Sequence, residues 1–67
     1  MKTTYDENAD AAYIYLKEKI EKGDVKKTIS LNENIILDFD KNEKLIGIEI
    51  LNASSVVPKK SISQFAS

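Results

Sequence analysis

The clearest regularity of the chain is an alternation of apolar and polar residues that recurs three times between Val25 and Leu51. A period of two places successive side chains on opposite faces of a β-strand, so each recurrence predicts a strand with one apolar face. Lys27 is the exception on these faces. The apolar positions are Val25, Ile29 and Leu31 in the first segment, Ile35, Leu37 and Phe39 in the second, and Ile46, Ile48 and Ile50 in the third.

The apolar faces also predict how these strands pair, because a one-residue slip would move the apolar set of a strand to the wrong face of the sheet. A connection at 32–34 places Ile29 opposite Leu37. A connection at 41–44 places Leu37 opposite Ile48, and a two-residue turn at Lys41 and Asn42 would also keep the apolar residues on one face. We therefore expect two consecutive antiparallel hairpins in this part of the chain.

The segment 9–22 has two interpretations. Its apolar residues fit the spacing of a helix and also fall largely on even positions, as in a strand. Glu and Lys residues near its end favour the helix. The strand is favoured by a hairpin around 21–24, which would place Glu18 opposite Lys27 and give that lysine a partner of opposite charge. We favour the strand.

The two ends of the chain add shorter elements. Residues 2–5 fit a short strand, followed by a polar turn at 6–10. The polar residues after the last strand are typical of a helix cap, and Pro58 suits the first turn of a helix. Ile62 and Phe65 are spaced to share one face of that helix. We therefore expect a short helix after the strands.

Together these elements predict an α+β fold that is mostly β, a small antiparallel β-meander of four or five strands with a short C-terminal helix. We expect one strand-rich domain at 1–57 and a short tail or helix at 58–67. The core would come from the apolar faces of the strands. The expected core residues are Ile14, Leu16, Ile29, Leu31, Leu37, Phe39, Ile46, Ile48 and Ile50.

A second group of large apolar residues falls on the opposite face of the same strands. A sheet face open to water would not gather so many of them, so either the C-terminal helix or another protein is expected to cover it. Gly47 lies inside the third segment, where glycine commonly marks a bulge or the close approach of another group. The candidate interaction face consists of Tyr13, Tyr15, Ile36, Leu45 and Leu51.

The amino-acid composition limits the kinds of partner and of catalytic group that the chain can have. Ten lysines and no arginine against eleven carboxylates give a net charge of -1, which does not favour nucleic acid as a partner. Without histidine and cysteine, the chain lacks the imidazole bases, thiolates and zinc ligands of many enzymes. No apolar run resembles a signal peptide or a membrane span. We expect a cytoplasmic protein that is not an enzyme and uses no cofactor.

Carboxylates are the remaining candidates for chemistry, as ligands of a metal ion. Asp38 and Asp40 lie two residues apart on one expected strand and share a face, and the expected register makes Glu49 a diagonal neighbour of Asp38. Three oxygen ligands of this kind suit Mg²⁺ or Ca²⁺, although a solvated sheet face explains them more simply. Asp6 and Asp10 flank the first turn, where aspartate commonly binds nearby backbone amides.

Several short motifs occur in an order that is typical of one family. They are Tyr5-Asp6, Ala9-Asp10-Ala11, Tyr13-Ile14 and Leu16, then Ile36-Leu37-Asp38-Phe39-Asp40 and Gly47-Ile48-Glu49-Ile50-Leu51 with Ala53-Ser54. From Met1 to Val57 the chain thereby resembles the small prokaryotic family catalogued as domain of unknown function 2283. The resemblance implies a compact, strand-rich domain, supports the strand at 11–16 and implies no activity.

A single small domain with an uncovered apolar face predicts a non-enzymatic protein–protein interaction module. We expect a homodimer or a complex with a small protein partner, and no binding to nucleic acid or to a membrane. The size and class of the chain suit the antitoxin-like half of a two-protein system. The alternative is a small carboxylate-based metal-binding protein or enzyme that uses Asp38, Asp40 and Glu49.

Overall fold

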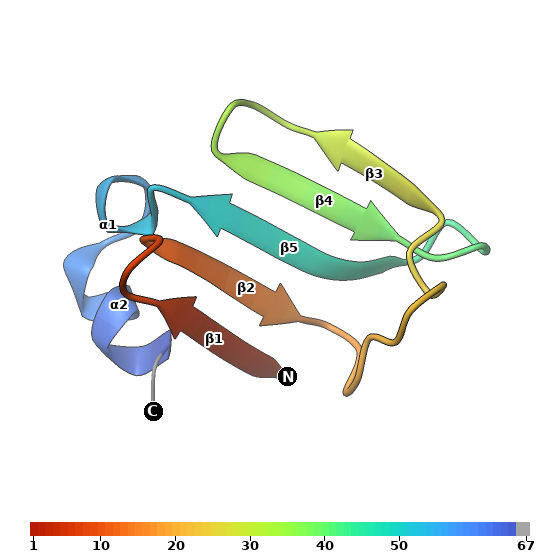
Figure 1. Cartoon of the computed structure of the whole chain (residues 1–67), viewed down its shortest axis with the longest axis horizontal. Coiled ribbons are helices and arrows are strands. Elements are labelled where there is room, and N and C mark those ends of the chain that lie inside the picture. Colours follow the sequence, from red (N-terminus) through yellow and green to blue (C-terminus); the bar gives the residue numbers. More distant parts are fainter. Residues whose placement is uncertain (66–67) are drawn as a thin grey trace.

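The computed structural model describes residues 1–65, so the last two residues of the expected tail lie outside it. The strands are β1 (Lys2–Asp6), β2 (Ala11–Tyr15), β3 (Lys27–Ser30), β4 (Ile35–Phe39) and β5 (Leu45–Leu51), and the helices are α1 (Ala53–Val56) and α2 (Lys59–Phe65). The strands form one sheet, and the helices lie together at one end of it, far from β3 (Figure 1). Within the described residues, no helix is long and apolar enough to cross a membrane. The expected fold class, α+β and mostly β, is confirmed.

The order of the strands across the sheet is β1-β2-β5-β4-β3, and every neighbouring pair is antiparallel. The hairpin expected to join β2 directly to β3 is therefore wrong, and the strands do not follow one another in sequence across the sheet. Residues 16–26 instead carry the chain from β2 to β3 as a loop. Lys27 binds Glu43 at 3.3 Å rather than Glu18.

β5 is a better neighbour for β2 than β3 because it is longer and more apolar. It spans seven residues, against four in β3. Across the ladder Ala12 lies opposite Ile50, and Ile14 lies opposite Ile48. Apolar pairs of this kind stabilise neighbouring strands. The same ladder confirms the strand expected near 11–16.

The register expected for the other strands is confirmed, with Ile29 opposite Leu37 and Leu37 opposite Ile48. At the end of β4 the ladder shifts, and Phe39 lies opposite Leu45. A β-bulge of this kind sets two residues of one strand against one residue of its partner and interrupts the alternation of faces. Parity therefore no longer assigns Leu45 to a face.

The helices cover the face of the sheet that carries Ile48 and Ile50, which we call the aliphatic face. Ala53 of α1 is fully buried, in a cluster with Ala12 and Ile50, and the two small alanines let the helix approach the sheet closely. The expected C-terminal helix is confirmed, but the alternative that it covers the face of Tyr13 is wrong. The half-buried side chains around this cluster are Tyr5, Ile14, Ile48, Val56, Val57, Ile62 and Phe65.

The helices cover only half of the aliphatic face, because the buried cluster under α1 contains no side chain of β3 or β4. Ile46 and Ile50 are buried, as expected. Leu16, Ile29 and Leu31 are 43%, 42% and 64% exposed, so their assignment to the core is wrong. They lie on the predicted face, but neither helix extends over them. This uncovered surface, which we call the bare half, consists of Leu16, Ile29, Leu31, Ile35, Leu37 and Phe39.

Candidate interaction surfaces

The face opposite the aliphatic face, which we call the tyrosine face, has a hydrogen-bonded network at its centre. The Tyr13 hydroxyl donates to Oδ2 of Asp38 at 2.6 Å, and the Thr28 hydroxyl donates to Oδ1 at 2.9 Å. Because β5 lies between β2 and β4, the Tyr13 side chain has to cross it. Gly47 leaves room for the crossing, since a β-carbon there would collide with the tyrosine ring. The close approach expected at this glycine is confirmed.

The protonation of Tyr13 keeps this network intact. Burial, and then the carboxylate of Asp38, raise the pKa of the Tyr13 hydroxyl above its ordinary value of 10.0. The phenol therefore stays a neutral donor at physiological pH. The hydrogen bond from Tyr13 to Asp38 links β2 to β4 across β5. The bond from Thr28 links β3 to the same carboxylate.

The structure brings together four of the five residues of the predicted interaction face. The rings of Tyr13 and Tyr15 meet edge to face, with their centroids 4.7 Å apart. Ile36 and Leu51 lie on the same face, and all four side chains are half-buried. Leu45 is set apart from them by the bulge. That this face binds a partner stays a prediction.

Two of the three carboxylates considered as metal ligands, Asp38 and Asp40, accept hydrogen bonds from the protein itself. Both oxygens of Asp38 accept hydrogen bonds in the network of the tyrosine face. Oδ1 of Asp40 accepts the backbone N–H groups of Asn42 and Lys44 and so stabilises the turn between β4 and β5. Glu49 is a diagonal neighbour of Asp38, as expected. Within residues 1–65, no group of three or more carboxylate, histidine or cysteine side chains is arranged to hold a metal ion.

Asp10 attaches the first turn to α1. Its Oδ1 accepts the backbone N–H of Ser54 at 3.0 Å and the hydroxyl of Tyr5 at 2.7 Å, and its Oδ2 accepts the Ser54 hydroxyl at 2.6 Å. The Ser54 hydroxyl, and then Tyr5, hold the pKa of the Asp10 carboxyl below its ordinary value of 3.8. The Asp10 carbonyl also accepts the N–H of Ala53. Asp10 thus caps a helix whose own N-cap residue, Asn52, makes no side-chain cap.

The structural role expected for the two aspartates of the first turn is confirmed. Oδ1 of Asp6 accepts the backbone N–H groups of Asn8 and Ala9, two and three residues further on. The partner of Asp10 was not foreseen, because Ser54 lies 44 residues away in the sequence. The one signal that could have pointed to it is the presence of both residues in the motifs of the family.

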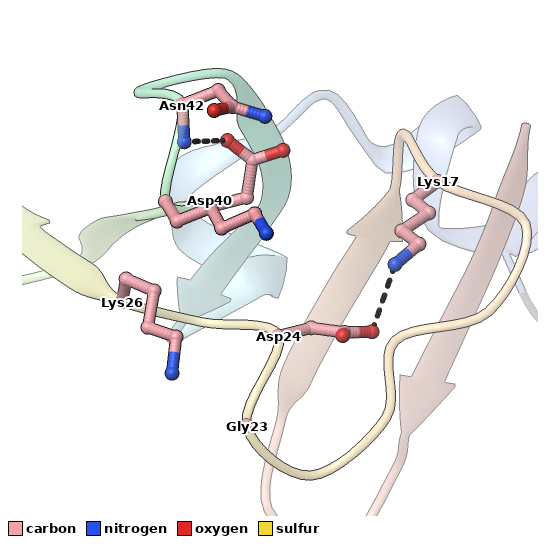
Figure 2. A pocket seen from close by; sticks show the side chains of 7 residues that line it. Lys17, Gly23, Asp24, Lys26, Asp40 and Asn42 are labelled. Atoms are coloured by element: carbon pink, nitrogen blue, oxygen red, sulfur yellow. Dashed lines mark hydrogen bonds and ion pairs between the residues drawn. The ribbon is translucent and has the colours of Figure 1, made fainter.

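A polar hollow lies between the 16–26 loop and the turn that joins β4 to β5 (Figure 2). Lys17 Nζ binds Oδ2 of Asp24 at 2.9 Å, and the same oxygen accepts the N–H of Glu21 at 2.7 Å. The Glu21 amide, and then Lys17, lower the pKa of the Asp24 carboxyl. These bonds close the loop on itself and pair two of the charges of the hollow. Its lining consists of Lys17, Gly23, Asp24, Lys26, Asp40, Lys41 and Asn42.

The bare half differs from the hollow in being apolar and open. Apart from Met1, the large hydrophobic side chains that are exposed within residues 1–65 all belong to it. Ile29 lies on β3, the outermost strand, and Leu31 follows it directly. The sequence pattern identified these side chains but assigned them to the core, so the bare half was missed as a candidate site.

Comparison with known proteins adds the family of the chain. No curated protein and no solved structure is significantly similar to it. A family model described as a protein of unknown function matches residues 2–54. The matched part contains the whole sheet and ends at Ser54, the residue that Asp10 binds, while α2 follows after it. The chain belongs to the DUF2283 family, as the resemblance of its motifs predicted.

Proposed function

We propose that this protein is a non-enzymatic protein–protein interaction module and that the bare half is its binding surface. The observation that supports this is the exposure of Leu16, Ile29 and Leu31 on one face of the sheet. Ile29 and Leu31 lie two residues apart on the same face of the sheet edge, and Leu16 follows β2 at the other end of the same face. Exposed apolar patches commonly mark binding sites. Covering the exposed part of each of these side chains would contribute about 1 kcal/mol to binding.

The tyrosine face supports this function less, because its groups already have partners within the chain. Tyr13 donates to Asp38, and Lys2 Nζ lies 5.3 Å from the centroid of the Tyr15 ring. A partner bound there would have to replace these contacts before it gained new ones. The same bonds favour a structural role for Asp38 over a catalytic one.

The test compares one variant on each face. Leu31→Asp places a charge on the bare half at a position that is 64% exposed, so the fold should tolerate it. Tyr15→Asp places the same charge on the tyrosine face. Affinity purification from host cells measures capture of partner proteins, light scattering measures self-association, and circular dichroism verifies that each variant is folded. We expect Leu31→Asp to abolish association and Tyr15→Asp to preserve it.

The reverse result would contradict this assignment. If only Tyr15→Asp abolished association, the binding surface would be the tyrosine face. If neither folded variant differed from the wild type, the bare half would not be a binding surface.

Two finer expectations from the sequence belong to this proposal. A cytoplasmic protein partner, such as the other half of a two-protein system with an antitoxin-like member, is the kind of partner that the capture experiment would identify. The carboxylate-based alternative has weaker support, since Asp38 and Asp40 already accept hydrogen bonds from the protein.

A further inference from the structure

We propose that the partner is a second copy of this chain, which pairs antiparallel with β3 along its free edge and places Ser30 on the two-fold axis. This inference rests on the proposed function, because it identifies a partner for the strand that borders the bare half. It goes further by specifying the strand, its direction and its register.

β3 has the backbone of an open edge. All four of its residues are exposed. On its inner side the N–H of Leu31 donates to the carbonyl of Ile35 on β4 at 2.8 Å. In an antiparallel ladder the residues between such bonds face the other way, so Thr28 and Ser30 direct their N–H and C=O groups out of the sheet. A row of outward backbone groups is a template for another strand.

The other edge of the sheet, β1, lacks the exposed aliphatic side chains of β3. α2 packs beside β1, which carries no exposed large hydrophobic side chain (Figure 1). Tyr5 of β1 is already part of the cluster around Ala53. Only the β3 edge therefore combines outward backbone groups with exposed aliphatic side chains within the described part of the chain.

The side chains select one register for the pairing. To keep the aliphatic faces of both copies on the same side of the sheet, the numbers of paired residues must have an even sum. With Ser30 opposite Ser30 of the second copy, Ile29 lies opposite Leu31 of the second copy. In the same register, Lys27 faces the turn at 31–34 of the second copy, which carries the exposed carboxylate of Glu33.

The neighbouring registers lack this complementarity. A register centred one residue earlier sets Lys27 opposite Leu31 of the second copy. A register centred one residue later sets Ile29 against the turn of the second copy that carries Glu33. The register centred on Ser30 therefore pairs Ile29 with Leu31 across the strands and brings Lys27 toward the turn that carries Glu33.

Lys27 is available for this contact. Its Nζ now lies 3.3 Å from Glu43 and 5.8 Å from the centroid of the Phe39 ring, and the Lys27 and Glu43 side chains are 50% and 79% exposed. Exposed ion pairs of this kind contribute little, so exchanging Glu43 for Glu33 of the second copy costs little. Because the two-fold axis repeats every contact, the exchange forms one such ion pair on each side of Ser30.

The pairing would also enlarge the binding surface. In Figure 1 the helices lie at the end of the sheet next to β1, and β3 lies on the opposite side. In the dimer the helices of both copies would stand at the outer ends of one continuous sheet. The two bare halves, each with Ile35 and Leu37, would meet between them as one apolar surface.

The test uses an engineered disulfide, because the chain has no cysteine of its own. Paired residues on the two-fold axis have α-carbons about 5.5 Å apart, within the range that a disulfide spans. In a glutathione redox buffer we expect Ser30→Cys to form a covalent dimer about tenfold faster than Thr4→Cys, an exposed position on the β1 edge. Light scattering should show wild-type molar mass rising from one chain to two with concentration.

A charge swap tests the register without cysteine. Lys27→Glu and Glu33→Lys should each weaken the dimer severalfold, and the double variant should restore it. A wild-type monomer at every concentration would overturn the inference, as would equal cross-linking rates at Ser30→Cys and Thr4→Cys. If Leu31→Asp still abolished capture of a different protein, the proposed function would stand without the dimer. If Leu31→Asp changed nothing, both would fall.

Discussion

Replacing Gly47 with alanine is a direct test of the network on the tyrosine face. A β-carbon at position 47 would lie 2.9 Å from Cε2 of Tyr13 and would collide with Cζ and the hydroxyl oxygen of the same side chain. The ring would therefore have to leave its place over β5, and its 2.6 Å hydrogen bond to Asp38 would break. The backbone of Gly47 accepts alanine, because its φ is not positive.

The expected cost is the sum of three terms. A hydrogen bond to a charged group contributes about 1.5–3 kcal/mol, and the half-exposed position of Tyr13 reduces this to about 1 kcal/mol. Displacing a packed ring adds about 1–3 kcal/mol. Alanine restricts the unfolded chain more than glycine does, which stabilises the folded state by about 0.4–1 kcal/mol. The net loss of stability is about 1–3.5 kcal/mol, or about 4–28 °C in Tm for a domain of this size.

The assay is thermal and urea unfolding followed by circular dichroism, in two backgrounds. In the wild type, Gly47→Ala should lower the free energy of unfolding by the amount above. In a Tyr13→Val background the ring is absent, so the same change should be neutral or slightly stabilising. An equal loss in both backgrounds would show that alanine acts on the strand itself, and no loss in the wild type would show that the ring does not lie over Gly47. Either result would refute the reasoning.

Three further predictions follow from the contacts described above. Because the folded state holds the pKa of Asp10 below 3.8, its stabilisation is present above about pH 4 and is lost as the pH falls through the lower, folded value. Asp10→Asn should therefore lower the Tm at pH 7 by about 4–8 °C, and the difference from the wild type should shrink below pH 4; a constant difference would contradict this. Ile62→Ala, which removes a half-buried contact of α2, should cost about 1–2 kcal/mol in urea unfolding, whereas the exposed Lys60→Ala should cost less than about 0.5 kcal/mol; equal costs would show that α2 does not stabilise the sheet. Millimolar Mg²⁺ or Ca²⁺ should leave the Tm unchanged, because both oxygens of Asp38 already accept hydrogen bonds, and a rise that grows with metal concentration would restore the metal-binding alternative.

The local part of the fold could be read from the sequence. A period of two excludes every register that would put the apolar sets on different faces, and connections at 32–34 and 41–44 then predict the observed pairing of Ile29 with Leu37 and of Leu37 with Ile48. Asp6 binds amides two and three residues away, so its role also follows from local chemistry.

The partner of β2 could not be read in the same way. β3 and β5 both present apolar residues with suitable parity, so alternation alone allows either strand to lie beside β2. The structure selects β5 because Ala12 opposite Ile50 makes a flat surface on which Ala53 packs. That packing joins residues about forty positions apart in the sequence, and no local pattern specifies it.

The bare half shows the difference between what the sequence pattern determines and what the tertiary structure determines. Leu31 and Ile50 belong to the same pattern and lie on the same face, yet Leu31 is exposed and Ile50 is buried. Alternation determines which side chains share a face, because it depends only on the geometry of a strand. What covers that face depends on where the chain returns after β5, and here the bonds between Asp10 and Ser54 direct α1 over one half of the sheet and leave the other half open.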